Sequence, residues 1–225
     1  MRQKLSIVLI MLVCLVLPSQ AEVVYTTDFE NWELSSNWSF TANSKPYLFS
    51  TFGNETFLGL YNERERVAFH ADLPAHQAVK LSFDLYVVGG WGNTIEPVGR
   101  DIWELSFNDF SIFKGQFHNV DSTNANKRSF ANLMSSGTCR LISEDTLSLW
   151  FWDRYLDSIY HVEIVVPDTS TDLNLLFGSG AGSDNYCLKT WGIDNFTVST
   201  VPEPSTVTSL LLGLIAVVLP GRKQR

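Results

Sequence analysis

In the stretch Val79-Lys80-Leu81-Ser82-Phe83-Asp84-Leu85-Tyr86-Val87, an aliphatic or phenyl side chain alternates with a side chain that carries a polar group. Successive side chains of a β-strand point to opposite faces, so every second residue shares a face. One face of this stretch would be wholly apolar, and it consists of Val79, Leu81, Phe83, Leu85 and Val87. The period of two predicts a half-buried strand whose apolar face packs against a core.

Similar short segments recur along the chain. Residues 161–166 alternate and stop at Pro167, and residues 173–177 are closed by Gly178-Ser179-Gly180. Shorter candidates occupy residues 23–29, 47–51, 57–61, 66–70, 102–107, 111–117, 147–152 and 192–199. No long stretch between them keeps the 3.6-residue apolar period of a helix. We therefore expect an all-β domain, an antiparallel β-sandwich of jelly-roll type.

Residues 1–21 have the composition of a secretory signal peptide. Arg2 and Lys4 precede an almost wholly apolar run over residues 5–17, and Pro18-Ser19-Gln20-Ala21 follows. A basic region, an apolar region and a small-x-small cleavage site in this order are typical of such signals. We expect cleavage after Ala21 and export of the remaining chain, so that residues 22–200 fold outside the cytoplasm.

The other end of the sequence combines three features. Pro202-Glu203-Pro204 precedes an uncharged, mainly apolar run over residues 205–219, and Arg222-Lys223-Gln224-Arg225 follows. The run of about fifteen residues is shorter than the roughly 20 that usually span a bilayer. Its basic end would stay on the cytoplasmic side of a membrane. An ordinary membrane anchor and a buried core helix are the alternatives.

These three features, in this order, resemble the PEP-CTERM sorting signal of envelope-bearing bacteria. The resemblance implies that an exosortase-type membrane protease recognises Pro202, Glu203 and Pro204 while a C-terminal transmembrane helix holds the chain in the inner membrane. It also implies a final location in the cell envelope or extracellular matrix. The chain would comprise a signal peptide (1–21), a β-sandwich domain (22–200) and a sorting signal (201–225).

The domain between the two processing segments is strongly acidic. The whole chain has 16 Lys+Arg and 24 Asp+Glu. Without the two basic residues of the signal, the three of the tail and Glu203, residues 22–200 keep 11 basic and 23 acidic residues, a net charge of −12. Such a surface disfavours nucleic acid and anionic membranes as partners. It suits divalent cations, although solubility alone also explains it.

Cysteine and histidine give little sign of metal chemistry. Cys139 and Cys187 remain after signal removal, and in an oxidising compartment a disulfide between them is expected. The sequence has no Cys-x-x-Cys, and its histidines are scattered at positions 70, 76, 118 and 161. This pattern does not predict a zinc site.

Asp28-Phe29-Glu30 near the start and Trp191-Gly192-Ile193-Asp194-Asn195-Phe196 near the end resemble the opening and closing segments of galactose-binding-like and concanavalin-like sandwiches. The resemblance implies that the last strand pairs near the first. It also implies that Asp28, Glu30 and Asp194 hold a structural Ca²⁺, an ion that prefers oxygen ligands. Solvated carboxylates and a turn cap at Asp194 are the alternative.

A glycine-rich loop over residues 89–100 follows the best strand and contains Trp91. Loops at the end of a sandwich often carry binding residues, and sugar rings pack their C–H faces on aromatic rings. Trp91 lies between glycines and is the best candidate for an exposed ring, with Asn93 and Asp101 as polar neighbours; a ring packed against the domain is the alternative. Trp103, flanked by Ile102 and Leu105, is expected in the core.

No catalytic constellation is evident. The sequence lacks a Gly-x-Ser-x-Gly elbow, a His-Glu-x-x-His motif and a phosphate-binding glycine loop. We therefore expect a non-enzymatic, exported envelope or matrix protein that binds exopolysaccharide. A secreted glycan-active hydrolase and a purely structural interaction module are the alternatives.

Overall fold

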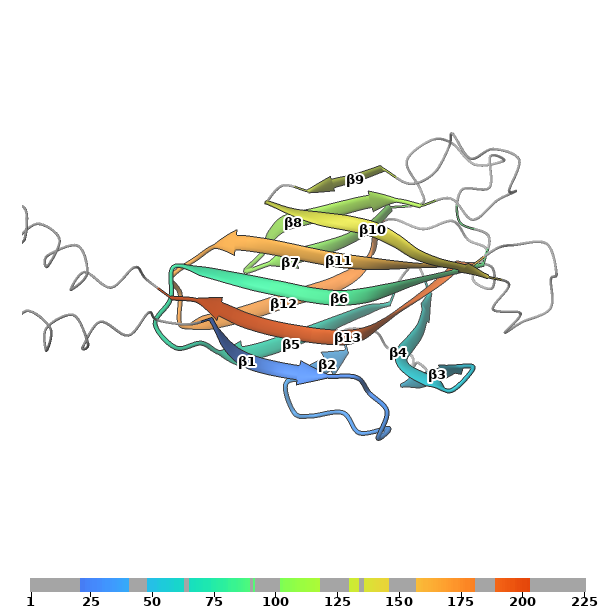
Figure 1. The fold of residues 1–225 in the computed structure, drawn as a ribbon, viewed down its shortest axis with the longest axis horizontal. Coiled ribbons are helices and arrows are strands. Elements are labelled where there is room, and N and C mark those ends of the chain that lie inside the picture. Colours follow the sequence, from blue (N-terminus) through green and yellow to red (C-terminus); the bar gives the residue numbers. More distant parts are fainter. Residues whose placement is uncertain are drawn as a thin grey trace, which may run out of the picture.

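The computed structural model describes residues 21–40, 48–62, 65–89, 91, 102–117, 130–133, 136–145, 157–180 and 189–202. These residues form thirteen strands and no helix. All strand pairs are antiparallel, and the strands make two sheets that face each other (Figure 1). The described part of the chain thus confirms the expected all-β, sandwich-like class.

The first sheet has seven strands in the order β10-β11-β6-β13-β4-β3, with β1 also paired to β13. They are β1 (Glu22–Thr27), β3 (Phe49–Phe52), β4 (Glu55–Asn62), β6 (Ala78–Gly89), β10 (Ser136–Asp145), β11 (Asp157–Pro167) and β13 (Lys189–Val201). The second sheet has six strands in the order β2-β5-β12-β7-β8-β9. They are β2 (Trp38–Phe40), β5 (Arg66–Asp72), β7 (Ile102–Phe107), β8 (Phe110–Gln116), β9 (Phe130–Leu133) and β12 (Asp172–Gly180).

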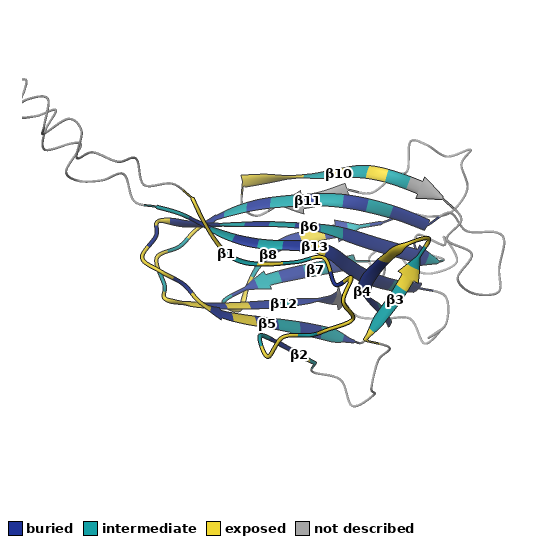
Figure 2. Cartoon of the chain, turned by 60° about the horizontal axis from the view of Figure 1, so that its bottom comes forward, coloured by how far each residue is buried: buried dark blue, intermediate teal, exposed yellow. Residues whose placement is uncertain are grey.

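The alternating stretch forms the middle of β6, between β11 and β13. Its five apolar side chains, at residues 79, 81, 83, 85 and 87, are all 0% exposed, as the period of two predicts. Lys80, Ser82 and Asp84 are only partly buried on the opposite face. The alternation of buried and intermediate residues can be followed along β11 and β6 in Figure 2.

Aromatic rings fill the space between the sheets. Phe177 of β12 lies within 6.2 Å, between ring centroids, of four other rings. Two of these rings come from its own sheet and two from the facing one: Trp38, Trp103, Phe83 and Phe196. Trp103 is fully buried, which confirms its predicted place in the core.

A second, smaller apolar cluster lies on the other face of the first sheet. Phe57 of β4 stacks on Tyr86 of β6, with centroids 4.2 Å apart and planes at 4°. Phe57 fits there because residue 192 of β13 is glycine: a Cβ at Gly192 would lie 2.6 Å from the Phe57 ring. Gly192 thus leaves space beside β13 for the Phe57 ring of the neighbouring strand β4.

Three strands were not predicted. β2 has three residues, β9 falls inside a polar segment, and β10 has the sequence SGTCRLISED, which lacks alternation. β9 and β10 end their sheets, β10 pairing β11 and β9 pairing β8. Edge strands bury less of their surface, so their sequences carry a weaker periodic signal. The strand predicted at residues 147–152 lies outside the described residues.

We expect Phe177→Ala to lower the free energy of unfolding by about 3–5 kcal/mol, because it leaves a cavity among four rings. The control Phe110→Ala removes a phenyl ring that is 77% exposed and should change stability by less than about 0.5 kcal/mol. Urea unfolding of the full chain in mild detergent measures both variants. Equal effects of the two substitutions would contradict the described core.

Candidate metal centre

Three carboxylates meet beside the last strand of the first sheet. One oxygen each of Glu30, Glu55 and Asp194 lies within 4.8 Å of the others. Glu30 comes from the turn after β1, Glu55 begins β4, and Asp194 lies in the middle of β13. Three segments that are far apart in the sequence therefore supply one group of oxygen ligands.

The pairing of β13 explains why the group forms there. On one side, β13 pairs β4 through residues 190–193 and β1 through residues 196–200. Asp194 and Asn195 lie between these two pairings, where β1 ends and β4 begins. Asn195 has a positive φ of 50°, and the register of β13 with β6 shifts at this point. Such a bulge re-aims side chains next to it.

The turn that carries Glu30 is anchored in the core. Phe29 has a positive φ of 55° and is buried, with its ring 5.7 Å from that of Trp38. The backbone N–H of Phe29 donates to Thr27 Oγ1 (3.2 Å). Glu30 Oε1 accepts a hydrogen bond from the backbone N–H of Thr56 (2.8 Å), which ties the turn to β4.

Asp194 is the buried member of the group, with 1% of its surface exposed. Its Oδ1 accepts a hydrogen bond from the backbone N–H of Asn195 (2.7 Å). Burial raises the pKa of Asp194 to about 7; this hydrogen bond lowers the pKa, and the carboxylates of Asp84, Glu30 and Glu55 raise it further. Burial and the same carboxylates also raise the pKa of the Tyr86 hydroxyl.

No cationic side chain balances this group among the residues described. The ion pairs there join other residues, and none involves Glu30, Glu55 or Asp194. A buried carboxylate without a cation is costly, so it is either protonated or neutralised by a bound ion. Carboxylate oxygens gathered from loop and strand ends are the ligand type that Ca²⁺ prefers. The donor set therefore fits the expected ion.

The predicted calcium ligands are only partly brought together. Glu30 and Asp194 lie in the group, whereas Asp28 is exposed and its Oδ1 accepts from the backbone N–H of Glu30 (3.3 Å). Glu55 was not predicted. Its place depends on the β3–β4 hairpin pairing with β13, which no local pattern around Glu55 indicates.

Trp91, the candidate for an exposed ring, is buried, as the alternative interpretation had it. Its side chain is 0% exposed, its Nε1 donates to the backbone carbonyl of Thr190 (2.9 Å), and its ring meets Phe117 edge-on. A tight turn, in which the Trp91 N–H donates to the Gly89 carbonyl (2.8 Å), folds the ring back onto the core. Asn93 and Asp101 lie outside the described residues.

Trp32 is exposed instead. Its side chain is 56% exposed, whereas the other tryptophans of the described residues, at positions 38, 91, 103 and 191, are buried. Trp32 has a positive φ of 58°, and its N–H donates to the Phe29 carbonyl (3.0 Å). Its ring contacts that of Phe49 edge-on, with centroids 5.9 Å apart. The turn that supplies Glu30 therefore also presents an aromatic face to solvent.

The remaining predictions fall mostly outside the described residues. Pro202 directly follows β13, whereas Glu203, Pro204 and the apolar run over residues 205–219 are not described. No helix in the described ranges is long and apolar enough to cross a membrane. Cys139 on β10 has a free thiol whose pKa burial raises to about 12, and Cys187 is not described, so their disulfide stays a prediction.

Searches of protein-family models, curated proteins and solved structures found no match to this chain. The fold and the site define its class: an all-β, sandwich-like domain of two antiparallel sheets with a partly buried group of carboxylates.

With divalent cations chelated, we expect the contribution of Asp194 to the free energy of unfolding to fall as the pH rises. Its folded-state pKa of about 7 lies above its ordinary value of 3.8. The folded state therefore holds the proton more tightly than the unfolded state. This contribution is complete below about pH 4 and is lost as the pH rises through about 7.

Urea unfolding between about pH 4 and 7 should show that the free energy of unfolding depends less on pH in Asp194→Asn than in the unsubstituted chain, because asparagine has no proton to release. The variant can still accept the hydrogen bond from the Asn195 N–H. Identical pH profiles of the two chains would refute the raised pKa.

Proposed function

We propose that this chain is an exported, non-catalytic β-sandwich module of jelly-roll type that binds polysaccharide in the cell envelope or extracellular matrix. The observation that carries the proposal is the turn of residues 28–32. It combines a carboxylate of the candidate metal centre, Glu30, with the exposed ring of Trp32. An exposed aromatic ring beside polar groups is the usual means of holding a sugar ring.

Calcium has a structural part in this proposal. Glu30, Glu55 and Asp194 would hold the ion, which would neutralise the buried carboxylate and fix the turn to β4 and β13. The backbone of the turn is already set by the buried ring of Phe29. Bound calcium would then keep Trp32 in one position, which lowers the entropy lost when a ligand binds.

The sorting part of the proposal rests on the tail sequence. Pro202-Glu203-Pro204, the apolar run and the basic end would be recognised and cut by an exosortase-type membrane protease. Before cutting, the apolar run would anchor the exported chain in the inner membrane. Pro202 lies one residue beyond β13, so the cleavage motif would follow the folded domain directly.

Affinity electrophoresis of the full chain in mild detergent, through gels containing exopolysaccharide, tests the binding function. We expect calcium-dependent retardation that Trp32→Ala weakens about tenfold, equivalent to about 1.4 kcal/mol. Phe110→Ala, which removes an exposed ring on the β7–β8 hairpin, is the matched control and should bind normally. Glu55→Gln should need more calcium for the same retardation.

Other results of these experiments would point to a different function or site. Normal retardation of the Trp32→Ala chain would remove Trp32 from the contact. No retardation with or without calcium would favour a purely structural module, and release of new reducing ends would favour a hydrolase. A melting temperature that calcium leaves unchanged would reject the metal centre.

Replacing Pro202, Glu203 and Pro204 with alanine should leave the chain unprocessed in a host that contains an exosortase. The mass of the envelope-associated chain, measured by mass spectrometry, would then include the tail. The matched control replaces Thr206 and Thr208 with alanine, which keeps the apolar run intact, and should be processed normally. Equal processing of both variants would disprove recognition of the motif.

A further inference from the structure

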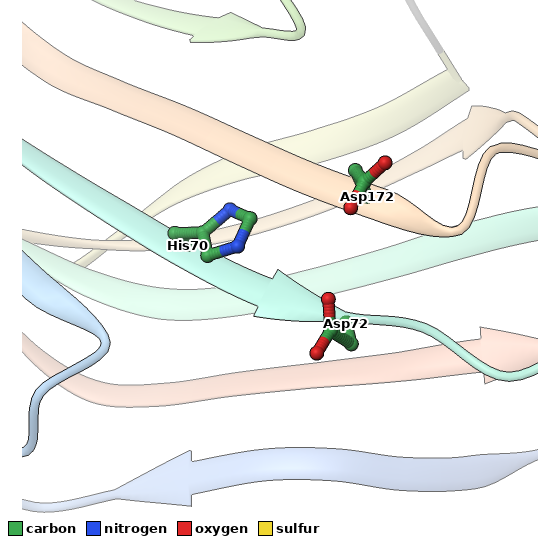
Figure 3. A group of neighbouring side chains, drawn as sticks. All are labelled: His70, Asp72 and Asp172. Atoms are coloured by element: carbon green, nitrogen blue, oxygen red, sulfur yellow. The ribbon is translucent and has the colours of Figure 1, made fainter.

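A second group of metal-ligating side chains lies on the other sheet. One ligand atom each of His70, Asp72 and Asp172 lies within 4.8 Å of the others, and all three side chains are exposed. His70 and Asp72 are two residues apart on β5, so they share a face of the sheet, and Asp172 begins the neighbouring strand β12. Figure 3 shows the three side chains approaching one another across the two strands.

The imidazole of His70 has a defined orientation. Its Nδ1 lies 3.0 Å from Oδ1 of Asn174, the residue directly opposite it on β12. A carbonyl oxygen can only accept, so Nδ1 is the donor in this contact, and in the neutral imidazole with that tautomer Nε2 has a lone pair for a metal. Nε2 points toward the carboxylates in Figure 3. A histidine whose other ring nitrogen is held by a hydrogen bond is the usual arrangement at metal sites.

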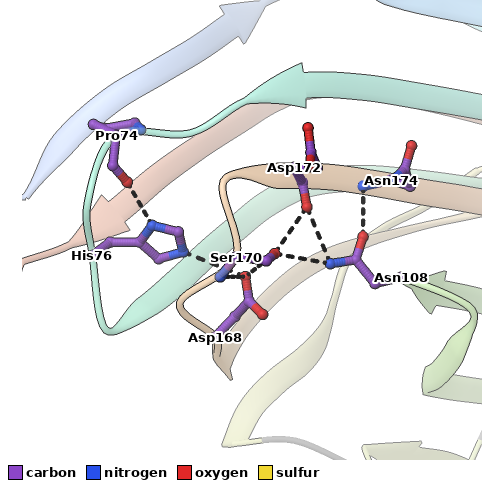
Figure 4. Close-up of polar contacts among 7 residues, drawn as sticks. All are labelled: Pro74, His76, Asn108, Asp168, Ser170, Asp172 and Asn174. Carbon is purple, nitrogen blue, oxygen red and sulfur yellow. Dashed lines mark hydrogen bonds and ion pairs between the residues drawn. The ribbon is translucent and has the colours of Figure 1, made fainter.

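A network of polar contacts fixes the strand that carries Asp172 (Figure 4). Asn108 Oδ1 accepts from the backbone N–H of Asn174 (2.9 Å), and Asn108 Nδ2 donates to the backbone carbonyl of Asp172 (3.1 Å). Ser170 Oγ lies 2.9 Å from the same carbonyl. The ligand Asp172 and the orienting residue Asn174 are therefore positioned by one side chain, Asn108.

The charges in this group are unbalanced. Asp72 and Asp172 are directly opposite each other in the antiparallel pair, where like charges destabilise a sheet. Among the described residues, neither carboxylate has a hydrogen bond or an ion pair, and none joins His70 to them. The three ligand atoms thus face a common point without touching. A cation at that point would remove the repulsion between the carboxylates.

We propose that His70, Asp72 and Asp172 form a second metal site, which binds a divalent transition-metal ion such as Zn²⁺ in preference to Ca²⁺. The imidazole nitrogen determines this preference, because Zn²⁺ accepts nitrogen and oxygen ligands whereas Ca²⁺ takes oxygen ligands. Three protein ligands leave coordination positions for solvent, and the exposed side chains leave them accessible. The bound ion is therefore exchangeable and open to a further ligand. The site is independent of the proposed polysaccharide binding.

Isothermal titration of the untagged full chain with Zn²⁺, in mild detergent and saturating Ca²⁺, tests the proposal. If the proposed calcium site is filled under these conditions, the carboxylates at Asp194 are occupied, and Zn²⁺ should bind at one further site. His70→Ala and Asp172→Asn should each weaken this site at least about tenfold. The control Asp109→Asn removes an exposed carboxylate on the same sheet, at a turn position with φ of 68° that asparagine tolerates, and should bind normally.

Two further measurements separate this site from general binding to an acidic surface. Co²⁺ in place of Zn²⁺ should absorb visible light more strongly than aqueous Co²⁺, because protein ligands lower the symmetry and coordination number of the ion, and His70→Ala should remove this increase. Asn174→Ala should weaken Zn²⁺ binding about tenfold by releasing the imidazole. Unchanged Zn²⁺ affinity in both His70→Ala and Asp172→Asn, or displacement of Zn²⁺ by equimolar Ca²⁺, would overturn the proposal. Thermal unfolding in the absence of metal confirms that each variant is folded.

Discussion

Burial of one face of β6 is the constraint on which the rest of the first sheet depends. Five apolar side chains of this strand are fully buried against the second sheet, and β11 and β13 flank it. If the pairing register of β6 shifted by one residue, these side chains would face outward and the opposite face, which includes Lys80, Ser82 and Asp84, would be buried. The register of β6 is therefore fixed, and β13, which pairs with it, places Asp194 opposite Asp84.

The candidate metal centre follows from an interruption in that pairing. The bulge at Asn195 separates the part of β13 that pairs β4 from the part that pairs β1. The interruption leaves Asp194 buried at the boundary, next to the carboxylates of Glu30 and Glu55. Three other residues of the closing segment also have a physical role: Trp191 packs in the core, Gly192 leaves room for Phe57, and Asn195 donates to Asp84.

The sequence predicted what depends on local pattern, and the resemblance implied the observed pairing of the last strand with the first, but the other strand pairings were missed. Alternation located β6, and Ile102–Phe107 was predicted with its exact bounds. Glu55 and the group at His70 escaped because each depends on one distant residue, Asp194 or Asp172, that lies on a strand whose pairing no local signal indicates. The burial of Trp91 could not be decided from the sequence, because flanking glycines indicate a turn and not the direction in which the side chain points.

The pairing of β1 with β13 also has a mechanical consequence. Glu22 lies opposite Thr200, so β1 starts and β13 ends at the same end of the sandwich (Figure 1). A chain tethered beyond Val201 would transmit a pulling force along the axis of β13. Because antiparallel hydrogen bonds run perpendicular to the strands, this force would shear the bonds on both sides of β13 together. Hydrogen bonds that are loaded together in shear withstand a larger force than bonds that open one after another.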